Sequence, residues 1–411
     1  MADTNTVIIG AGHAGLAMSR CLADRGVAHV VLEAGQVGER WHSARWDSFR
    51  LLTPNWLSRL PGWAYAGPDP DGFLTAGEFA DHLSAYARSF DAPVRTGTLV
   101  TRVERAAAGF AVHTDRGGWA ARNVVVATGF HSYPKLPELA ARPAPDVAQL
   151  TAAGYRSPSS LPDGGVLVVG ASASGVQIAY ELARAGRPVV LAVGCHTRLP
   201  RRYRGRDILW WLDRIGALDR GADQVPAEAV RAEPSLQLVA TAEARGIDLG
   251  VVQAAGVRLT GRLRAIDGAV AGFADDLVDT VAAAHQRLTR LLGQIDRYVA
   301  GTPGLAAPLP DPPPVVTVPA TPSRLDLRRA GMSAVVWATG FRPRYRWLAV
   351  PVLDRDGQIR HHRGVTEVPG LYAIGLRFQS RRKSTFIDGA RHDAVALAEQ
   401  ISAGRALRLA G

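Results

Sequence analysis

The sequence predicts an α/β protein with two Rossmann-like domains, the second inserted into the first. The stretches TVIIGAGHAG (residues 6–15) and VLVVGASASG (residues 166–175) each lead from an apolar strand through a glycine-containing turn into a helix. The strand end VVVATGF (residues 124–130) is repeated as AVVWATGF (residues 334–341). Two turns and two repeated strand ends are the organisation of one such domain placed within another.

Composition excludes several classes of protein. The chain has 411 residues, 47% of them hydrophobic, which is enough for two or three lobes with a substantial core. The net charge of +11 could attract nucleic acid, but only Lys135 and Lys383 of the 48 basic residues are lysines, and the arginines are spread along the chain. Two cysteines, scattered histidines and no long apolar run predict no disulfide framework, no metal site, no membrane span and a cytoplasmic location.

The first turn has the spacing needed to hold a dinucleotide. Gly10 makes the tight turn, Gly12 lets backbone amides approach a pyrophosphate, and Gly15 lets the helix pack on the strand. Glu33 ends the next strand, where a ribose hydroxyl needs an acceptor. We therefore expect a dinucleotide with free ribose hydroxyls at this turn.

The second turn differs in ways that favour another ligand. It keeps Gly170 and Gly175 but has Ser172 at the middle position, followed by Ser174, and Val193 stands where the first unit has its glutamate. No carboxylate would therefore repel a 2′-phosphate at this position. Several arginines follow within a few residues and could bind that phosphate, which predicts NADPH as the ligand. The alternative for these arginines is a solvated basic loop. The arginines are Arg198, Arg201, Arg202 and Arg204.

Nearly the whole chain resembles the class B flavoprotein monooxygenases, which include flavin-containing, YUCCA-type and Baeyer-Villiger monooxygenases, and in particular their short bacterial members. Besides the two turns, the resemblance rests on GERW (38–41), LLTPNWLSRLPG (51–62), both ATGF segments, LPRRY after the second turn, and PGLYAIG (369–375). It implies FAD in the first turn, NADPH in the second and the flavin ring between the lobes. The further cofactor-binding residues that it implies are Arg40, Trp41, Val103, Thr128, Gly129, Thr339, Gly340, Gly375 and Asp388.

The resemblance also implies a reaction. The flavin would take hydride from NADPH, react with O2 to a C4a-peroxyflavin and transfer one oxygen atom to nitrogen, sulfur or a ketone of a small substrate. Asn55 matches the neighbourhood of a flavin-facing asparagine and is the candidate catalytic residue; the alternative is a turn residue beside Pro54. Asp388 would lie at the start of the last helix, where that helix points at the flavin, or would only cap the helix. Trp210, Trp211 and the RFQSRRK loop hint at an aromatic or acidic substrate, or are ordinary surface.

One departure from the family pattern concerns the linker before the second turn. In PDVAQLTAAGYRSP (residues 145–158), Tyr155 is kept but Thr151 replaces the histidine that is thought to couple the two domains. Two alternatives to oxygen transfer therefore stay open: an NADPH-flavin oxidase or reductase, and a flavin-binding regulatory protein without catalysis.

The expected domains are residues 1–150 and 326–411 for FAD and residues 151–325 for NADPH. A helical insertion is expected at about 272–301, because apolar residues recur every three or four positions from Leu277 to Val299. This helix either packs on the core or forms a lid or a homodimer contact.

Overall fold

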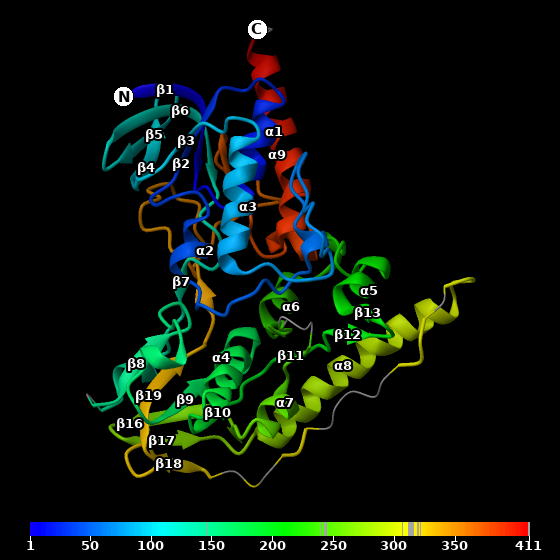
Figure 1. Ribbon diagram of the computed structural model, residues 1–411. Coiled ribbons are helices and arrows are strands. Elements are labelled where there is room, and N and C mark those ends of the chain that lie inside the picture. Colours follow the sequence, from blue (N-terminus) through cyan, green and yellow to red (C-terminus); the bar gives the residue numbers. More distant parts are fainter. Residues whose placement is uncertain are drawn as a thin grey trace.

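The computed structural model describes residues 1–411 except 145, 240, 242–244, 306, 311–315, 319, 321 and 410–411. It has two lobes, each built on a mainly or wholly parallel sheet, and both termini lie at the far end of the first lobe (Figure 1). The predicted α/β class and the pair of Rossmann-like domains are confirmed.

The first lobe contains a seven-stranded sheet with the order β3-β2-β1-β6-β5-β4, in which β21 also pairs with β6. β1 and β6 run parallel, whereas β4, β5 and β6 form an antiparallel meander. The strands are β1 (Ala2–Ile9), β2 (His29–Leu32), β3 (Val94–Arg95), β4 (Val100–Ala106), β5 (Gly109–Thr114), β6 (Gly117–Val126) and β21 (Leu371–Ala373).

Helices from both ends of the chain cover this sheet. α1 and α9 pack side by side, and α3 contacts α1 (Figure 1). Their apolar faces share one buried cluster with the sheet, which includes Leu16, Phe79 and Leu397. The C-terminal segment is therefore part of the lobe that begins at the N-terminus. The helices are α1 (His13–Ala23), α2 (Glu39–Ser43), α3 (Ala76–Arg88) and α9 (Ile387–Leu409), with a 3₁₀ turn η1 (Asn55–Leu57).

The second lobe has a parallel sheet with the order β15-β10-β9-β19-β8, and a small antiparallel sheet of β16, β17 and β18 packs nearby. The strands are β8 (Ala148–Thr151), β9 (Gly165–Val169), β10 (Val189–Ala192), β15 (Arg258–Thr260), β16 (Leu263–Asp267), β17 (Val270–Phe273), β18 (Arg324–Asp326) and β19 (Met332–Trp337). The helices beside them are α4 (Ala173–Arg184) and α7 (Leu249–Ala254), with 3₁₀ turns η2 (Glu138–Ala141) and η3 (Pro158–Ser160).

A helical subdomain lies between the lobes and along the second one (Figure 1). Four positions of the predicted apolar stripe on α8 (Leu277–Ala300) are buried: Leu277, Ala284, Leu288 and Ile295. The C-terminal half of this face packs against α5 (Ile208–Arg214), so the helix contributes to the core. The other elements here are α6 (Ala227–Ala232), η4 (Ala222–Gln224) and the strand pairs β11 (Thr197–Arg198) with β14 (Leu236–Gln237) and β12 (Arg202–Tyr203) with β13 (Arg206–Asp207).

The chain crosses between the lobes at a two-stranded link. β7 (Tyr133–Pro134) pairs antiparallel with β20 (Phe341–Arg342), and each follows one ATGF segment. β8 and β19 both belong to the second sheet, so that lobe starts before residue 151 and extends past residue 325. These limits differ from the expected boundaries because the second ATGF segment follows β19, a strand of the second sheet and not of the first.

Candidate functional site

The outer glycines of both turns are required by close backbone packing. Gly10 and Gly170 have φ values of +108° and +106°, which side-chain-bearing residues rarely adopt. A Cβ atom on Gly15 would lie 1.9 Å from the carbonyl oxygen of Gly10, and one on Gly175 would lie 1.8 Å from that of Gly170. Each helix thus begins directly against its own turn.

The two ATGF segments complete the two turns in the same way. A Cβ atom on Gly10 would lie 2.7 Å from the carbonyl oxygen of Ala127, and one on Gly170 would lie 2.5 Å from that of Ala338. The absence of a side chain on Gly10 and on Gly170 therefore lets the neighbouring strand end approach the first residue of each turn.

The middle positions are the place where the two turns differ. Gly12 has φ −78° and ψ −179°, and Ser172 has φ −80° and ψ −173°, so the backbones match. No atom lies within 4 Å of a Cβ built on Gly12, which leaves open space above the first helix N-terminus. In the second turn this position carries a hydroxyl group that makes no capping hydrogen bond to its own helix and can donate to a phosphate.

A cleft of about 400 Å³ opens beside the first turn. The Glu33 carboxylate lies at its edge and accepts hydrogen bonds from the amides of Ala11 (2.7 Å) and Gly35 (3.0 Å). The open position at Gly12 and this carboxylate fit the pyrophosphate and a ribose of a dinucleotide. The predicted residues that line the cleft are Gly10, Gly12, Glu33, Arg40, Trp41, Thr128, Gly129 and Gly375.

The cleft also contains basic and aromatic side chains, of which only Arg40 and Trp41 were predicted. Arg40 donates to the carbonyl oxygen of His131 (2.9 Å), and the Arg45 guanidinium lies 5.0 Å from the ring of Trp41. Burial lowers the pKa of Arg45 to about 10, which leaves it charged at pH 7. Burial likewise lowers the pKa of His13 and of His131 to about 4, so both imidazoles are neutral at pH 7.

Val103 and Asn55 are among the predicted site residues that do not line this cleft. Val103 is fully buried in β4, and its amide donates to the carbonyl oxygen of Trp347, which does line the cleft. The side chain of Asn55 donates to the carbonyl oxygen of Asp69 (2.9 Å) and accepts from the amide of Leu74 (2.8 Å). Both polar atoms of the Asn55 side chain thus hold a surface loop. This is the behaviour of a turn residue beside Pro54, which was the alternative to a flavin-facing role.

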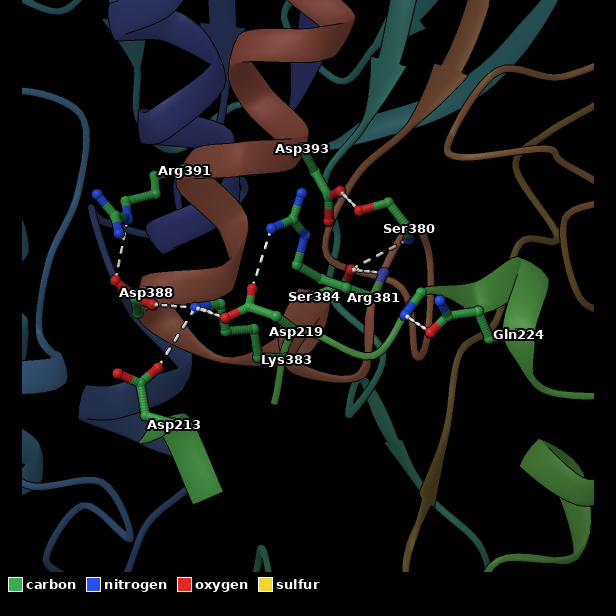
Figure 2. A network of polar contacts seen from close by, with 11 residues as sticks. Asp213, Asp219, Gln224, Ser380, Arg381, Lys383, Ser384, Asp388, Arg391 and Asp393 are labelled. Carbon is green, nitrogen blue, oxygen red and sulfur yellow. Dashed lines mark hydrogen bonds and ion pairs between the residues drawn. The ribbon is translucent and has the colours of Figure 1, made fainter. Parts of the chain in front are cut away.

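Asp388 belongs to a buried ion-pair network at the start of α9 (Figure 2). Its carboxylate is fully buried and lies 2.8 Å from Arg59 Nε, 3.1 Å from Lys383 Nζ and 2.9 Å from Arg391 Nε. Lys383 in turn lies 3.1 Å from a carboxylate oxygen of Asp219, a residue of the helical subdomain. Asp388 therefore helps to join the two parts of the molecule, and it is not among the residues that line the cleft.

The arginines after the second turn are engaged within the protein. Arg201 is buried; its guanidinium donates to the carbonyl oxygen of Leu52 (2.7 Å), pairs with Asp207 (2.6 Å) and lies 4.8 Å from the Phe73 ring. This differs from the expected contact with a phosphate, because a group committed in this way is not available to a ligand. The neighbours are also engaged: Arg198 pairs with Asp248, Arg204 with Asp296, and the exposed Arg202 donates to the carbonyl oxygen of Gly205.

Another arginine lies at the end of β10, where the adenosine ribose of a Rossmann-bound dinucleotide is placed. Arg262 follows β15, which pairs with β10, and its Nη2 atom lies 3.2 Å from Cys195 Sγ. Its side chain is 46% exposed, and a Cβ atom on Gly194 would meet nothing within 4 Å. The sequence did not single out Arg262, because only the pairing of β10 with β15, whose partner residues are 68 positions apart, brings it to this place.

The second ATGF segment forms part of the link between the lobes. The Thr339 hydroxyl donates to the carbonyl oxygen of Lys135 (2.6 Å), and the amide of Lys135 donates to the carbonyl oxygen of Gly340 (2.8 Å). In the structure these two predicted residues therefore hold the crossing strands together.

The linker that lacks the expected histidine is tied to the first lobe by an arginine. The Thr151 side chain accepts only from the amide of Gly154 (3.2 Å) among the described contacts, and the buried Tyr155 hydroxyl donates to Glu181 (2.8 Å). The next residue, Arg156, donates to the carbonyl oxygens of Ser43 and Arg45, the latter at 3.0 Å. Sequence reasoning missed Arg156, although it directly follows Tyr155, which the linker shares with the family pattern.

Neither a metal centre nor a membrane span emerges from the part of the chain that the structure describes. Its His, Cys, Asp and Glu side chains form no cluster of three or more that could hold a metal ion. Its helices include none that is long and apolar enough to cross a bilayer.

Comparisons with known proteins agree with this architecture. The model of the pyridine nucleotide-disulphide oxidoreductase family matches residues 7–204. An uncharacterized CzcO-like oxidoreductase of Geobacillus kaustophilus is 33% identical over 97% of this chain and 98% of its own length. YUCCA9 of Arabidopsis thaliana, a probable indole-3-pyruvate monooxygenase, is 30% identical over 51% of this chain and 54% of its own length.

A solved structure shows the same fold over the whole chain. A variant of a flavin monooxygenase from Stenotrophomonas maltophilia superimposes with a TM-score of 0.68 and 20% identity, and the match covers 98% of this chain and 99% of that one. The chain therefore belongs with the CzcO-like oxidoreductases and is a class B flavoprotein monooxygenase-like protein, whose relatives imply FAD and a nicotinamide dinucleotide as cofactors.

Proposed function

We propose that the protein is an NADPH-dependent FAD monooxygenase. It would consume NADPH, a proton and O2, insert one oxygen atom into a small organic substrate and release the other as water. The substrate would react at nitrogen or sulfur, or at a ketone in a Baeyer-Villiger reaction. The observation that carries this proposal is the presence, in one chain, of two turns with matching backbones but different middle residues, Gly12 and Ser172.

The chain's own groups would bind and orient the cofactors. Backbone amides above Gly12 would bind the FAD pyrophosphate, and the Glu33 carboxylate would accept hydrogen bonds from ribose hydroxyls. Bound FAD supplies the redox chemistry, and few side chains need to take part in it. Arg40 and Arg45, both in the cleft, would add positive charge beside an anionic cofactor.

The preference for NADPH would depend on Arg262. Val193 leaves no carboxylate at the end of β10, Gly194 leaves space, and the partly exposed Arg262 guanidinium lies beside Cys195. A 2′-phosphate placed there would gain a charge-assisted hydrogen bond that NADH lacks. Arg262 makes only a long contact with a carboxylate, 3.9 Å from its Nε atom to Asp276, so its guanidinium stays accessible to a ligand. It replaces the buried Arg201 in this proposal, whereas Arg202 is also exposed and can contribute.

Efficient oxygen transfer also requires that water be kept from the flavin. Arg156 would serve this purpose by fixing the linker to residues 43–45, next to the cleft. The alternative function is an NADPH oxidase, which Thr151 favours because the expected coupling histidine is absent.

The experiment incubates the purified holoprotein with NADPH, O2 and an amine, a thioether or a ketone as candidate substrate. It measures the oxygenated product and the hydrogen peroxide formed per NADPH consumed. A monooxygenase forms one oxygenated product per NADPH with one of them and releases little hydrogen peroxide. Peroxide equal to NADPH consumption with every candidate would establish the oxidase. Absence of NADPH turnover would leave only a flavin-binding role.

A further inference from the structure

A second cavity, of about 670 Å³, lies between the helical subdomain and the C-terminal segment. Its walls come from α5, α8, the loop at residues 215–224, residues 233–236 and the segment that leads into α9. It is separate from the cleft beside the first turn, and the proposed function does not yet use it.

One part of this cavity is apolar. Several of its leucines belong to the buried cluster that packs α5 against α8, together with the ring of Phe386. Such a surface favours a ligand with an apolar body, because burying that body removes apolar area from water. The apolar lining residues are Leu199, Leu209, Leu212, Ile215, Leu218, Leu236, Leu291 and Phe386.

The polar part of the cavity is positively charged. Four arginines line it, Arg220, Arg287, Arg290 and Arg382, against two carboxylates, Asp219 and Glu233.

Both carboxylates are already neutralised. Asp219 pairs with Lys383 (3.1 Å) and Arg381 (3.0 Å), and Glu233 pairs with Arg382 and with Arg377 (3.4 Å).

The arginines of α8 are left without acidic partners. Within the described residues, Arg287 and Arg290 form no ion pair with a carboxylate, and neither does Arg220. Arg287 is held in place because its Nη2 atom donates to the carbonyl oxygen of His196 (2.7 Å), and its buried Nε atom has no hydrogen-bond partner. Arg290 is exposed one turn further along the same helix. The cavity therefore presents unpaired positive charge beside an apolar wall.

The cavity adjoins the dinucleotide cleft. Phe386 lines the cavity and the preceding residue, Thr385, lines the cleft. The ion pair between Lys383 and Asp388 fixes the short segment that separates them (Figure 2). A ligand in the cavity would thus be held directly across this segment from the cofactor site.

We propose that this cavity binds a small amphipathic carboxylate, with its apolar body against the leucines and its carboxylate at Arg287 and Arg290. Guanidinium groups bind carboxylates through charge-assisted, directional hydrogen bonds. This inference rests on the proposed function for its role, since it makes the carboxylate the substrate class of the same enzyme. The binding itself can be measured without turnover.

The test is calorimetric titration of the FAD-loaded protein, saturated with NADP⁺, with the thioether acid 4-(phenylthio)butyrate and with its neutral amide, 4-(phenylthio)butanamide. The acid should bind at least roughly 10-fold more tightly than the amide, as expected for a hydrogen bond to a charged group. Arg290→Gln and Arg287→Gln should each weaken binding of the acid by about 10-fold and leave the amide unchanged. Leu291→Asn should weaken both ligands alike, because it changes the apolar wall.

The matched control is Arg297→Gln, which removes an exposed arginine of the same helix that does not line the cavity. Equal affinities for acid and amide, or equal effects of the Arg290 and Arg297 substitutions, would overturn the proposal. If the acid binds as expected but is never oxygenated, the site stands and the monooxygenase proposal fails for this substrate class. If other substrates are oxygenated but the acid does not bind, the site fails and the proposed function stands.

Discussion

Arg156 in the linker donates a hydrogen bond of 3.0 Å to the backbone carbonyl oxygen of Arg45, whose side chain lines the dinucleotide cleft. The two residues belong to different lobes. Their contact connects the start of the second domain to the wall of the first cofactor site, and Arg156 follows, by five residues, the position of Thr151, where the family resemblance leads one to expect a histidine.

Replacing Arg156 should uncouple the two lobes. Arg156→Gln removes donors to Ser43 and Arg45, so water should enter the cleft more readily and the fraction of NADPH oxidation that ends as hydrogen peroxide should rise several-fold. The control is Arg187→Gln, since Arg187 also donates to several carbonyl groups, those of Pro158 and Gly164 among them, but within the second lobe. Equal peroxide release by the two variants would remove Arg156 from this role.

The first turn predicts opposite outcomes for two glycine substitutions. Gly12→Val should fold, because its φ is −78° and the new side chain meets open space, but that side chain should exclude the FAD pyrophosphate. Gly15→Val should not fold normally, because its Cβ would lie 1.9 Å from a backbone oxygen. Circular dichroism and flavin absorbance measure both effects. Full flavin occupancy in folded Gly12→Val would show that FAD does not bind above this turn.

Selectivity for NADPH should depend on Arg262. A hydrogen bond to a charged group contributes about 1.5–3 kcal/mol, so Arg262→Gln should lower the ratio of kcat/KM for NADPH to that for NADH roughly 10- to 150-fold. Arg258→Gln is the control, because Arg258 is exposed at the opposite end of β15. Retention of the full NADPH preference in Arg262→Gln would assign the 2′-phosphate to other residues.

Sequence reasoning could identify the two turns because their chemistry is local. Gly10, Gly15, Gly170 and Gly175 are fixed by contacts within a few residues and by the adjoining strand end, so their spacing alone predicts them. The α8 stripe is equally local.

The remaining site residues depend on contacts that spacing does not encode. Arg201 and Arg262 have the same chemistry, and only the fold buries the first beside Phe73 and brings the second to the end of β10. The same holds for Asp388, whose cationic partner Arg59 lies more than 300 residues away in the chain.

The buried carboxylate of Asp388 should be important for stability. Asp388→Asn leaves Lys383 and Arg59 without a shared counter-charge, and removing one partner of a buried ion pair costs on the order of 3 kcal/mol. Urea unfolding should therefore show a clear loss. Asp146→Asn breaks an exposed pair with Arg328 and should leave the unfolding midpoint almost unchanged. Similar midpoints for both variants would contradict the assignment of a buried network.

The most direct test of the central claim, that the protein transfers oxygen, is rapid mixing of the NADPH-reduced holoprotein with oxygenated buffer. We expect a transient absorbance that differs from those of reduced and oxidised flavin, and it should persist longer after reduction by NADPH than after reduction by dithionite, because bound NADP⁺ shields the site from water. Thr151→His should lengthen its lifetime if the linker limits domain coupling. Direct return to oxidised flavin, with stoichiometric hydrogen peroxide and no transient under either reductant, would contradict the monooxygenase account.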